Sequence, residues 1–413
     1  MGAPNEWYVD SGSTPGGNGT TTSTDETNAN RAFNSLSWAF AGVTQDAADG
    51  DKFNIKGTHT FPGFSSVDIA TTYGVPTQTA PLIFSGYGSE ANDGVRGTLD
   101  GGGSANQVII GSTATDFLYV IDMVIKDSGS ARVVDIGDHC ILINCEISGS
   151  SANGINADTG LYVSNCRFTN IGQNGILSEQ ACAIWRCVFD NDTDTSGDMN
   201  WAIQLDGDVL SISAFNTIGM AVVEECILDL DSDSKGINLQ SGGGDPLTQE
   251  SSQESVRSFI NNNSIYTSGN GTYGLSGTSG TKDQEVICQN NCVEGFATTG
   301  LRLRSGWGLF HGGNAAYDNA THFDISGDVV FTWGTATNTA LSASPFTNPG
   351  TNNWEGVGGN VLEAAEPNTI NGAASLDYRQ GRDKGAFQKE AIGGGPYYGI
   401  SQGLHTIESG ITA

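Results

Sequence analysis

One phrase returns three times in the middle of the chain, as Ile143-Asn144-Cys145-Glu146-Ile147, Ser164-Asn165-Cys166-Arg167-Phe168 and Trp185-Arg186-Cys187-Val188-Phe189. Its cysteines stand 21 residues apart twice, from 145 to 166 and from 166 to 187. A fixed period of about 20 residues or more is typical of a solenoid, in which each repeat packs against its neighbours. The phrase therefore predicts a solenoid.

Apolar residues recur five and three positions before each cysteine and two positions after it. They are Cys140, Leu142 and Ile147, then Leu161, Val163 and Phe168, then Cys182, Ile184 and Phe189. The same frame fits Leu118, Val120, Met123 and Ile125 earlier in the chain, and Ala221, Val223, Cys226 and Leu228 later. Apolar residues two apart predict short strands with one buried face. The polar gap at Asn144, Asn165, Arg186 or Glu225 predicts a bend between two strands.

Further short apolar segments lie between these phrases. They are Gly154-Ile155-Asn156, Gly175-Ile176-Leu177, Ala202-Ile203-Gln204-Leu205, Gly236-Ile237-Asn238-Leu239, Gly274-Leu275-Ser276 and Gly300-Leu301-Arg302-Leu303. A Rossmann fold or an α/β barrel would need amphipathic helices of about 10–15 residues between its strands, and the middle of the chain has none. The pattern therefore predicts an all-β protein, a parallel β-helix of about ten turns.

The eight cysteines are expected to be reduced. Cys145, Cys166, Cys187 and Cys226 occupy equivalent inward positions, and strands about 4.8 Å apart bring such side chains into one column. Small apolar thiols fill a core well. A set of disulfides is the alternative, and a zinc site is not expected because no CxxC pair exists.

Three parts are expected along the chain. Residues 1–60 form an N-terminal cap with a strand, a helix and the first rung, residues 61–388 form the β-helix, and residues 389–413 form a tail. The helix of the cap is predicted from its apolar residues Ala32, Phe33, Leu36, Trp38, Ala39, Phe40 and Val43. The tail is either disordered or an arm for assembly, an alternative suggested by Tyr397, Tyr398 and its isoleucines.

The layout resembles the right-handed parallel β-helix proteins of the pectate-lyase-like superfamily. The resemblance rests on the cap, the Asn-Cys rungs and Arg382-Asp383-Lys384-Gly385-Ala386-Phe387-Gln388, which is similar to the D-x-G-A-(F/Y) ending of many such β-helices. It covers roughly residues 5–388 and implies a right-handed solenoid. It implies no particular activity, because this fold carries unrelated functions.

Charge and hydrophobicity exclude some classes of partner. The net charge of −29, with only 17 Lys and Arg, argues against a nucleic-acid partner. No segment is long and apolar enough to suggest a membrane partner. The residues after Met1 lack the basic and apolar segments of a signal peptide.

Two acidic runs form a candidate metal site. Asp190, Asp192 and Asp194 follow Cys187 at the same distances at which Asp229, Asp231 and Asp233 follow Cys226. Two unit charges about 4.8 Å apart repel by about 3.5 kcal/mol at an effective dielectric near 20. Bound Ca²⁺ would relieve this repulsion. The alternative is that both runs are solvated turns, since neither has the spacing of an EF-hand.

No complete catalytic motif of a polygalacturonase or a pectate lyase occurs. The sequence therefore leaves open whether the protein is an enzyme, and it favours a protein without enzymatic activity. Asp190 and Asp229 are the candidate pair for glycoside hydrolysis. Trp185, with Arg186 and Glu224 beside it, is the candidate carbohydrate-binding site, because an outward Trp stacks well on a sugar ring. The alternative is that a later insertion, residues 206–218, covers Trp185.

Three functions fit these observations. The first is a structural or adhesive protein of a virus particle, because the chain resembles the β-helix spikes, fibres and surface decorations of phages. Its expected place is the virion surface, and its partners are other virion proteins, further copies of itself in a trimer, and a polysaccharide. The second is a polysaccharide lyase or glycoside hydrolase. The third is a secreted bacterial surface protein, which would be extracellular.

Overall fold

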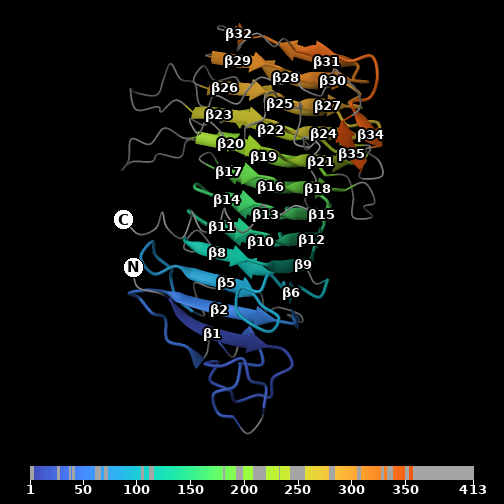
Figure 1. The fold of residues 1–413 in the computed structure, drawn as a ribbon. Helices are drawn as coiled ribbons and strands as arrows, with labels where there is room; N and C mark the ends of the chain where they lie inside the picture. The colour runs from blue at the N-terminus through green and yellow to red at the C-terminus, as the bar shows by residue number, and fades with distance from the viewer. Residues whose placement is uncertain are drawn as a thin grey trace, which may run out of the picture.

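The computed structural model shows a tall solenoid whose turns stack along one axis (Figure 1). It describes residues 4–25, 28–36, 39, 42–60, 67–68, 73–103, 107–110, 116–179, 182–191, 199–207, 220–231, 233–241, 256–278, 284–304, 308–326, 330–332, 338–348 and 353–356. Within these residues the strands form three parallel sheets of 12, 11 and 10 strands, called A, B and C here, and one antiparallel pair. The predicted parallel β-helix is therefore confirmed.

Each full turn of the solenoid places one strand in each sheet. Sheet A contains β1 (Asn5–Asp10), β2 (Asp51–Lys56), β5 (Leu82–Gly86), β8 (Leu118–Ile121), β11 (Ile141–Ile143), β14 (Tyr162–Ser164), β17 (Ala183–Trp185), β20 (Met220–Glu224), β23 (Val256–Asn261), β26 (Gln284–Gln289), β29 (Gly308–Gly312) and β32 (Val330–Thr332). Sheet B contains β3 (Thr58–Thr60), β6 (Gly97–Asp100), β9 (Met123–Gly129), β12 (Glu146–Ser150), β15 (Arg167–Ile171), β18 (Val188–Asp190), β21 (Ile227–Leu230), β24 (Ser264–Thr267), β27 (Cys292–Glu294), β30 (Ala315–Tyr317) and β33 (Thr339–Ala340).

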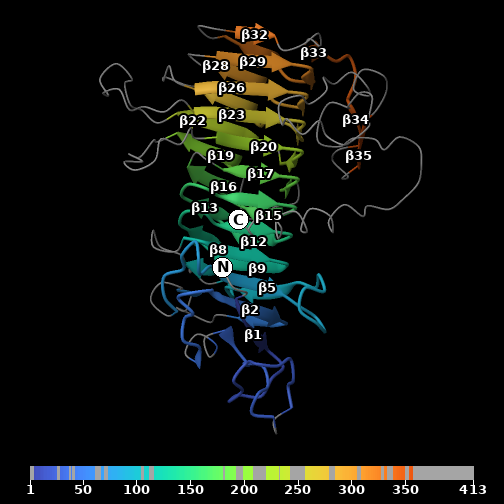
Figure 2. The same ribbon diagram turned by 60° about the vertical axis from the view of Figure 1, so that its left-hand side comes forward.

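Sheet C completes the turn and leads back to sheet A. It contains β4 (Val67–Asp68), β7 (Ile109–Ile110), β10 (Val134–Ile136), β13 (Ile155–Ala157), β16 (Asn174–Glu179), β19 (Trp201–Gly207), β22 (Ile237–Ser241), β25 (Tyr273–Thr278), β28 (Thr299–Arg304) and β31 (Thr321–Ile325). The antiparallel pair, β34 (Phe346–Asn348) and β35 (Asn353–Gly356), lies beside the solenoid in both views (Figures 1 and 2). No helix of the described residues is long and apolar enough to cross a membrane.

A single residue with positive φ makes the corner between sheets A and B. The series is Asp122, Asn144, Asn165, Arg186, Glu225, Asn262 and Asn290, with φ between 53° and 57°. This left-handed conformation is uncommon outside glycine and is best tolerated by Asn and Asp. The bends predicted at Asn144, Asn165, Arg186 and Glu225 are thus confirmed. Because these seven corners are alike, the turns that carry them stay in register.

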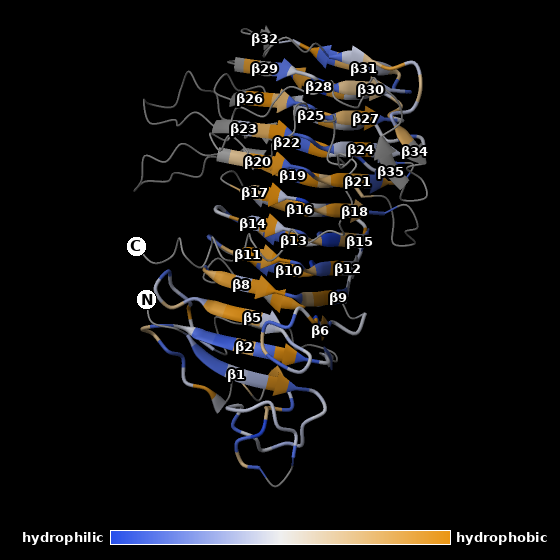
Figure 3. Cartoon of the chain, in the orientation of Figure 1, coloured by the Kyte–Doolittle hydropathy of each residue, from blue (hydrophilic) through white to orange (hydrophobic). Residues whose placement is uncertain are grey.

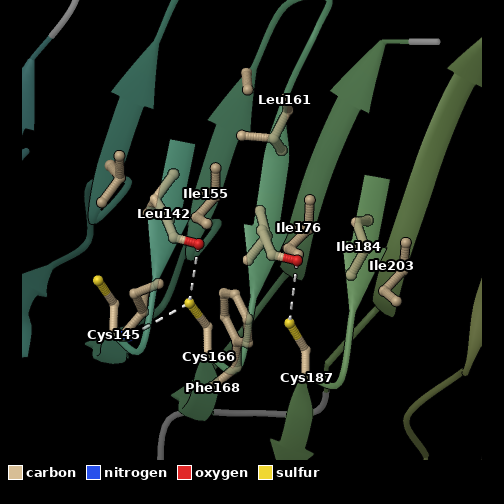
Figure 4. Packing of buried hydrophobic residues seen from close by; sticks show 14 of the residues in the cluster. Leu142, Cys145, Ile155, Leu161, Cys166, Phe168, Ile176, Ile184, Cys187 and Ile203 are labelled. Carbon is tan, nitrogen blue, oxygen red and sulfur yellow. Dashed lines mark hydrogen bonds between the residues drawn. The ribbon is translucent and has the colours of Figure 1, made fainter. Parts of the chain in front are cut away.

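Register brings equivalent side chains into inward columns. Leu142, Val163, Ile184 and Val223 are consecutive Cα partners in sheet A. The rings of Phe168 and Phe189 stack at 4.5 Å between centroids with 6° between their planes. Figure 4 shows these columns from close by, and Figure 3 shows the apolar residues gathered on the strands.

The cysteines behave as the sequence predicts. All eight are buried and none forms a disulfide. The Cys166 Sγ accepts a hydrogen bond from the Cys145 backbone N–H at 3.4 Å. Burial raises the pKa of Cys140, Cys182 and Cys288 to about 12, so these side chains stay thiols at neutral pH.

The column that begins with cysteines continues as a ladder of asparagines. The sheet B register places Asn263, Asn291 and Asn314 in the turns above Cys226. The Asn263 Nδ2 donates to the Asn291 Oδ1 at 2.9 Å, and the Asn291 Nδ2 donates to the Asn314 Oδ1 at 3.0 Å. Asn291 also bonds two backbone groups, the Asn263 N–H and the Ile260 carbonyl. Sequence reasoning missed this ladder.

The helix expected in the N-terminal cap is not supported. Among the described residues of that segment only Leu36, Ala39 and Gly42 are helical. Irregular chain covers the edge of β1: the Tyr8 N–H donates to the Gly19 carbonyl at 2.7 Å, and the Asp10 N–H donates to the Phe33 carbonyl at 2.8 Å. Phe33 and Leu36 are buried in the same core as the strands. The apolar residues were thus correctly expected to pack on the solenoid, but backbone pairing with β1 closes its edge. Residues 37–38 and 40–41 lie outside the described residues, as do 389–413.

The asparagine ladder gives a stability prediction. Asn291→Ala removes a buried amide that takes part in five hydrogen bonds, so we expect it to lower the free energy of unfolding by about 3 kcal/mol or more. Cys187→Ala, in the same column, removes only a sulfur atom and should cost about 1 kcal/mol. Chemical denaturation followed by circular dichroism measures both. Equal losses of unfolding free energy in the two variants would show that the hydrogen bonds of the ladder add no stability beyond that of a packed thiol.

Candidate functional site

The predicted acidic pair does come together on sheet B. Asp190 and Asp229 are Cα partners of β18 and β21. Asp190 forms an ion pair with Arg167 of the preceding turn, and Asp229 is 1% exposed. The first carboxylate is therefore engaged by a cation, and the second lies below the surface.

The remaining residues of the predicted calcium site do not form one group in the structure. Asp192 and Asp194 lie outside the described residues. Asp231 accepts hydrogen bonds from the Ser234 hydroxyl and backbone N–H, while Asp233 is exposed. In the part of the chain that the structure describes, no three His, Cys, Asp or Glu side chains are grouped to hold a metal ion. The calcium site stays a prediction.

The predicted carbohydrate site lies at the corner of sheets A and B. Trp185 is 38% exposed, and the Arg186 guanidinium lies 5.0 Å from the centroid of its ring. Arg186 also pairs with Glu225 at 2.7 Å. Glu224, the Cα partner of Trp185, is buried and accepts a hydrogen bond from Asn262 at 3.0 Å. Trp185 and Arg186 are therefore exposed together, but Glu224 is not at this surface.

A different cluster stands out on sheet C. Trp201 begins β19 and Tyr273 begins β25, and Lys235 lies in the turn between them, just before β22. Residues 201, 235 and 273 are equivalent positions, because Ile203 pairs with Ile237 and Ile237 pairs with Leu275. The Trp201 and Tyr273 rings lie nearly parallel, with 6.4 Å between centroids and 9° between planes.

Cations lie against both rings. The Lys235 Nζ is 5.3 Å from the centroid of Trp201, and the Arg302 guanidinium is 5.1 Å from the centroid of Tyr273. The Arg302 Nη1 also donates to the Tyr273 hydroxyl at 2.8 Å. Such cation–π contacts hold each ring in a fixed position. We call Trp201, Lys235, Tyr273 and Arg302 the aromatic–cationic surface.

Two further charged residues, Arg304 of β28 and Asp324 of β31, continue the aromatic–cationic surface. Arg304, half-exposed, follows Arg302 by two residues on β28 and forms an ion pair with Asp324 of β31 at 2.6 Å. Arg302 lies 3.9 Å from the same carboxylate. Two arginines thus share one carboxylate, which leaves a net positive charge in a chain whose total is −29. An anionic ligand is attracted to such a place.

Sequence reasoning missed the aromatic–cationic surface. Its members lie as far apart as 201 and 302, and segments of different length separate the turns that carry them. One signal was present: each lies within two residues of a Gly-Ile or Gly-Leu strand start or its Ala-Ile equivalent. Extending the strand alignment to those flanking positions would have placed Trp201, Lys235 and Tyr273 in one column.

No family model and no curated protein matches the chain. Among solved structures, it is similar to the pectate lyase Pel9A, with 15% identity and a TM-score of 0.55, over 94% of this chain and 97% of that one. The chain has the right-handed parallel β-helix fold of pectate-lyase-like proteins. This agrees with the fold expected from the Asn-Cys rungs.

Two other solved structures are similar at lower TM-scores. The catalytic domain of a GH87 α-1,3-glucanase matches at 13% identity and a TM-score of 0.31, over 75% of this chain and 66% of that one. The pectin methylesterase of Aspergillus niger matches at 11% identity and a TM-score of 0.30, over 84% and 94%.

Proposed function

We propose that this protein binds an anionic polysaccharide along sheet C, at the aromatic–cationic surface. The observation that carries the proposal is the pair of parallel rings at Trp201 and Tyr273, each with a cation against it. Aromatic faces pack on the apolar faces of sugar rings, as they do on other rings. Arg and Lys bind carboxylates or sulfates of the same chain through charge-assisted hydrogen bonds.

The spacing of the surface suits a polymer. Turns of the solenoid are about 4.8 Å apart, so the residues from Trp201 to Arg302 cover three steps, or roughly 14 Å, along the axis. A single sugar would touch one ring and one cation, whereas a chain lying along the axis would touch all four side chains. The affinity should therefore rise with the length of the oligosaccharide.

Cleavage of the bound polysaccharide is the second candidate function. It is favoured by the shared fold with the pectate lyase Pel9A, a polysaccharide-degrading enzyme. The candidate acids Asp190 and Asp229 lie on sheet B, away from the aromatic–cationic surface on sheet C. Hydrolysis by that pair would thus need a second binding place, so binding alone is the simpler function.

Binding is tested by calorimetry with polygalacturonate, alginate and hyaluronate, with dextran as the neutral control. We expect Tyr273→Ala and Arg302→Gln each to weaken binding about ten-fold or more, because each removes a stacking or charged contact. Added salt should weaken it further. Melting temperatures close to that of the parent protein exclude unfolding as the cause.

Trp185→Ala is the matched control, because it removes an exposed aromatic side chain from the corner of sheets A and B. We expect it to leave the affinity unchanged. Loss of binding in Trp185→Ala but not in Tyr273→Ala would refute the proposal and favour the Trp185 site. New reducing or unsaturated ends in the same incubations would show that the protein cleaves the polymer.

The place where this binding acts is proposed from the sequence alone. A stiff solenoid that holds a glycan suits the surface or an appendage of a phage particle, where it would bring the particle to a glycan-coated host. A trimer is the expected assembly, and residues 389–413 are its expected joint. A secreted bacterial surface protein would use the same binding surface.

Assembly is tested by mass photometry of the whole chain and of the chain that ends at residue 388. We expect a trimer or larger particle for the first and a monomer for the second, because the removed arm would carry the subunit contacts. Two monomers, or the same oligomer in both, would rule out the arm as the joint.

A further inference from the structure

A short segment covers part of the outer face of sheet B. Residues 341–348, which we call the strap, follow β33 and run back beside the solenoid (Figure 2). Leu341 and Phe346 are 7% and 3% exposed and pack with Cys292 and Ala315. Side chains of Ile227, Tyr266 and Tyr317 lie partly buried around them. The strap therefore hides an apolar and aromatic face that spans several turns.

A carboxyl group lies under the strap. Glu294 of β27 is 7% exposed, and its Oε2 is 2.8 Å from the Ser344 Oγ of the strap. Its Cα partners in the adjacent turns are Tyr266 and Tyr317. Burial raises the pKa of Glu294 to about 7, the Ser344 hydrogen bond acts in the opposite direction, and the negative charge of nearby Asp318 adds to the rise. Among the described residues no Lys, Arg or His forms an ion pair with it.

Two further acids of the same outer column lie two and three turns from Glu294: Asp229, the Cα partner of Tyr266, and Asp190, the partner of Asp229. The titratable and polar groups nearest Glu294 are therefore Tyr266, Tyr317, Asp318 and the Ser344 hydroxyl of the strap. Every charge among them is negative when ionised. An ionised Glu294 has nothing in this set that favours its charge except the Ser344 hydroxyl.

The Ser344 hydroxyl has one proton and more than one acceptor within reach. Its Oγ is 3.0 Å from the Phe346 carbonyl and 2.8 Å from Glu294. It also accepts a hydrogen bond from the Phe346 N–H at 3.2 Å. A hydroxyl donates only one hydrogen bond. With Glu294 ionised, the Ser344 hydroxyl donates to the carboxylate. A protonated Glu294 can instead donate to Ser344, which leaves the Ser344 proton for the Phe346 carbonyl.

We propose that Glu294 and Ser344 form a proton-operated latch, which holds the strap on sheet B in acidic solution and loosens it as the pH rises to neutral and above. The carboxyl group has an ordinary pKa of 4.5 when the strap is open and a raised pKa when it is closed. The closed state is most stable below about pH 4.5. It weakens as the pH rises towards 7 and is constant above that, because both states are then ionised.

Opening of the strap is measured at Cys292, which the strap buries completely. A pyridyl disulfide reacts with thiols in acid as well as in alkaline solution, and mass spectrometry assigns the label to Cys292. Glu294→Gln is the matched variant, because its amide donates to Ser344 at every pH as the protonated acid does. At each pH we divide the labelling rate of Cys292 in the parent protein by its labelling rate in the variant. The pH dependence of the thiol itself cancels in this ratio, because it is the same in both proteins.

We expect this ratio to be about one at pH 4.5 and about ten or more at pH 8. The full pKa difference would give roughly 300-fold, and the partial contact of Glu294 with solvent reduces it. A ratio near one at both pH values would overturn the latch. Ser344→Ala, which removes the hydroxyl, should speed labelling at pH 4.5 relative to the parent. An unchanged rate there would also refute the proposal.

Discussion

The corner between sheets A and B constrains the whole solenoid. One left-handed residue turns the chain at seven successive corners, from Asp122 to Asn290. A longer connection, residues 87–96, joins β5 to β6, and both strands still pair in register with β8 and β9. Asn and Asp adopt this conformation at low cost, whereas Arg186 and Glu225 adopt it at a cost of about 1–2 kcal/mol. The repeated corners bring equivalent inward side chains of successive turns into one column. The cysteine column and the asparagine ladder both follow from this.

The change from cysteine to asparagine within one column has a physical reason. An inward thiol fills space and bonds weakly, so a column of thiols depends on good packing with neighbours such as Phe168 and Phe189. An inward amide is stable only if both its donor and its acceptor are satisfied. The ladder meets this condition because each Asn bonds the amide and the backbone of adjacent turns, from Cys226 to Asn314. Thiols and hydrogen-bonded amides can thus both occupy the same inward column of the solenoid.

The sequence predicted most of the fold because three turns, those of Cys145, Cys166 and Cys187, have no insertions. Beyond Cys187 the spacing varies, beginning with the 39 residues from Cys187 to Cys226, and the ladder could not be recognised from a period. The predicted helical cap is not supported, for another reason: an apolar pattern shows which residues are buried, but not which part of the chain closes the edge of β1. The aromatic–cationic surface depends on residues about 100 positions apart, whose proximity only the register reveals.

The strap and the aromatic–cationic surface belong to the same turns but to different faces. Glu294 of β27 and Arg302 of β28 are separated by one short connection, in which Phe296 is fully buried. The Phe296 N–H is held by the Asn319 side chain at 2.9 Å, and Gly295 has a φ of +91°. The Cβ of any other residue at 295 would lie 2.3 Å from the Thr267 carbonyl oxygen, so this connection is tightly fixed. A packed, hydrogen-bonded connection of this kind does not deform gradually. Protonation of Glu294 therefore acts on the strap outside the solenoid, while the rings and cations on sheet C keep their positions.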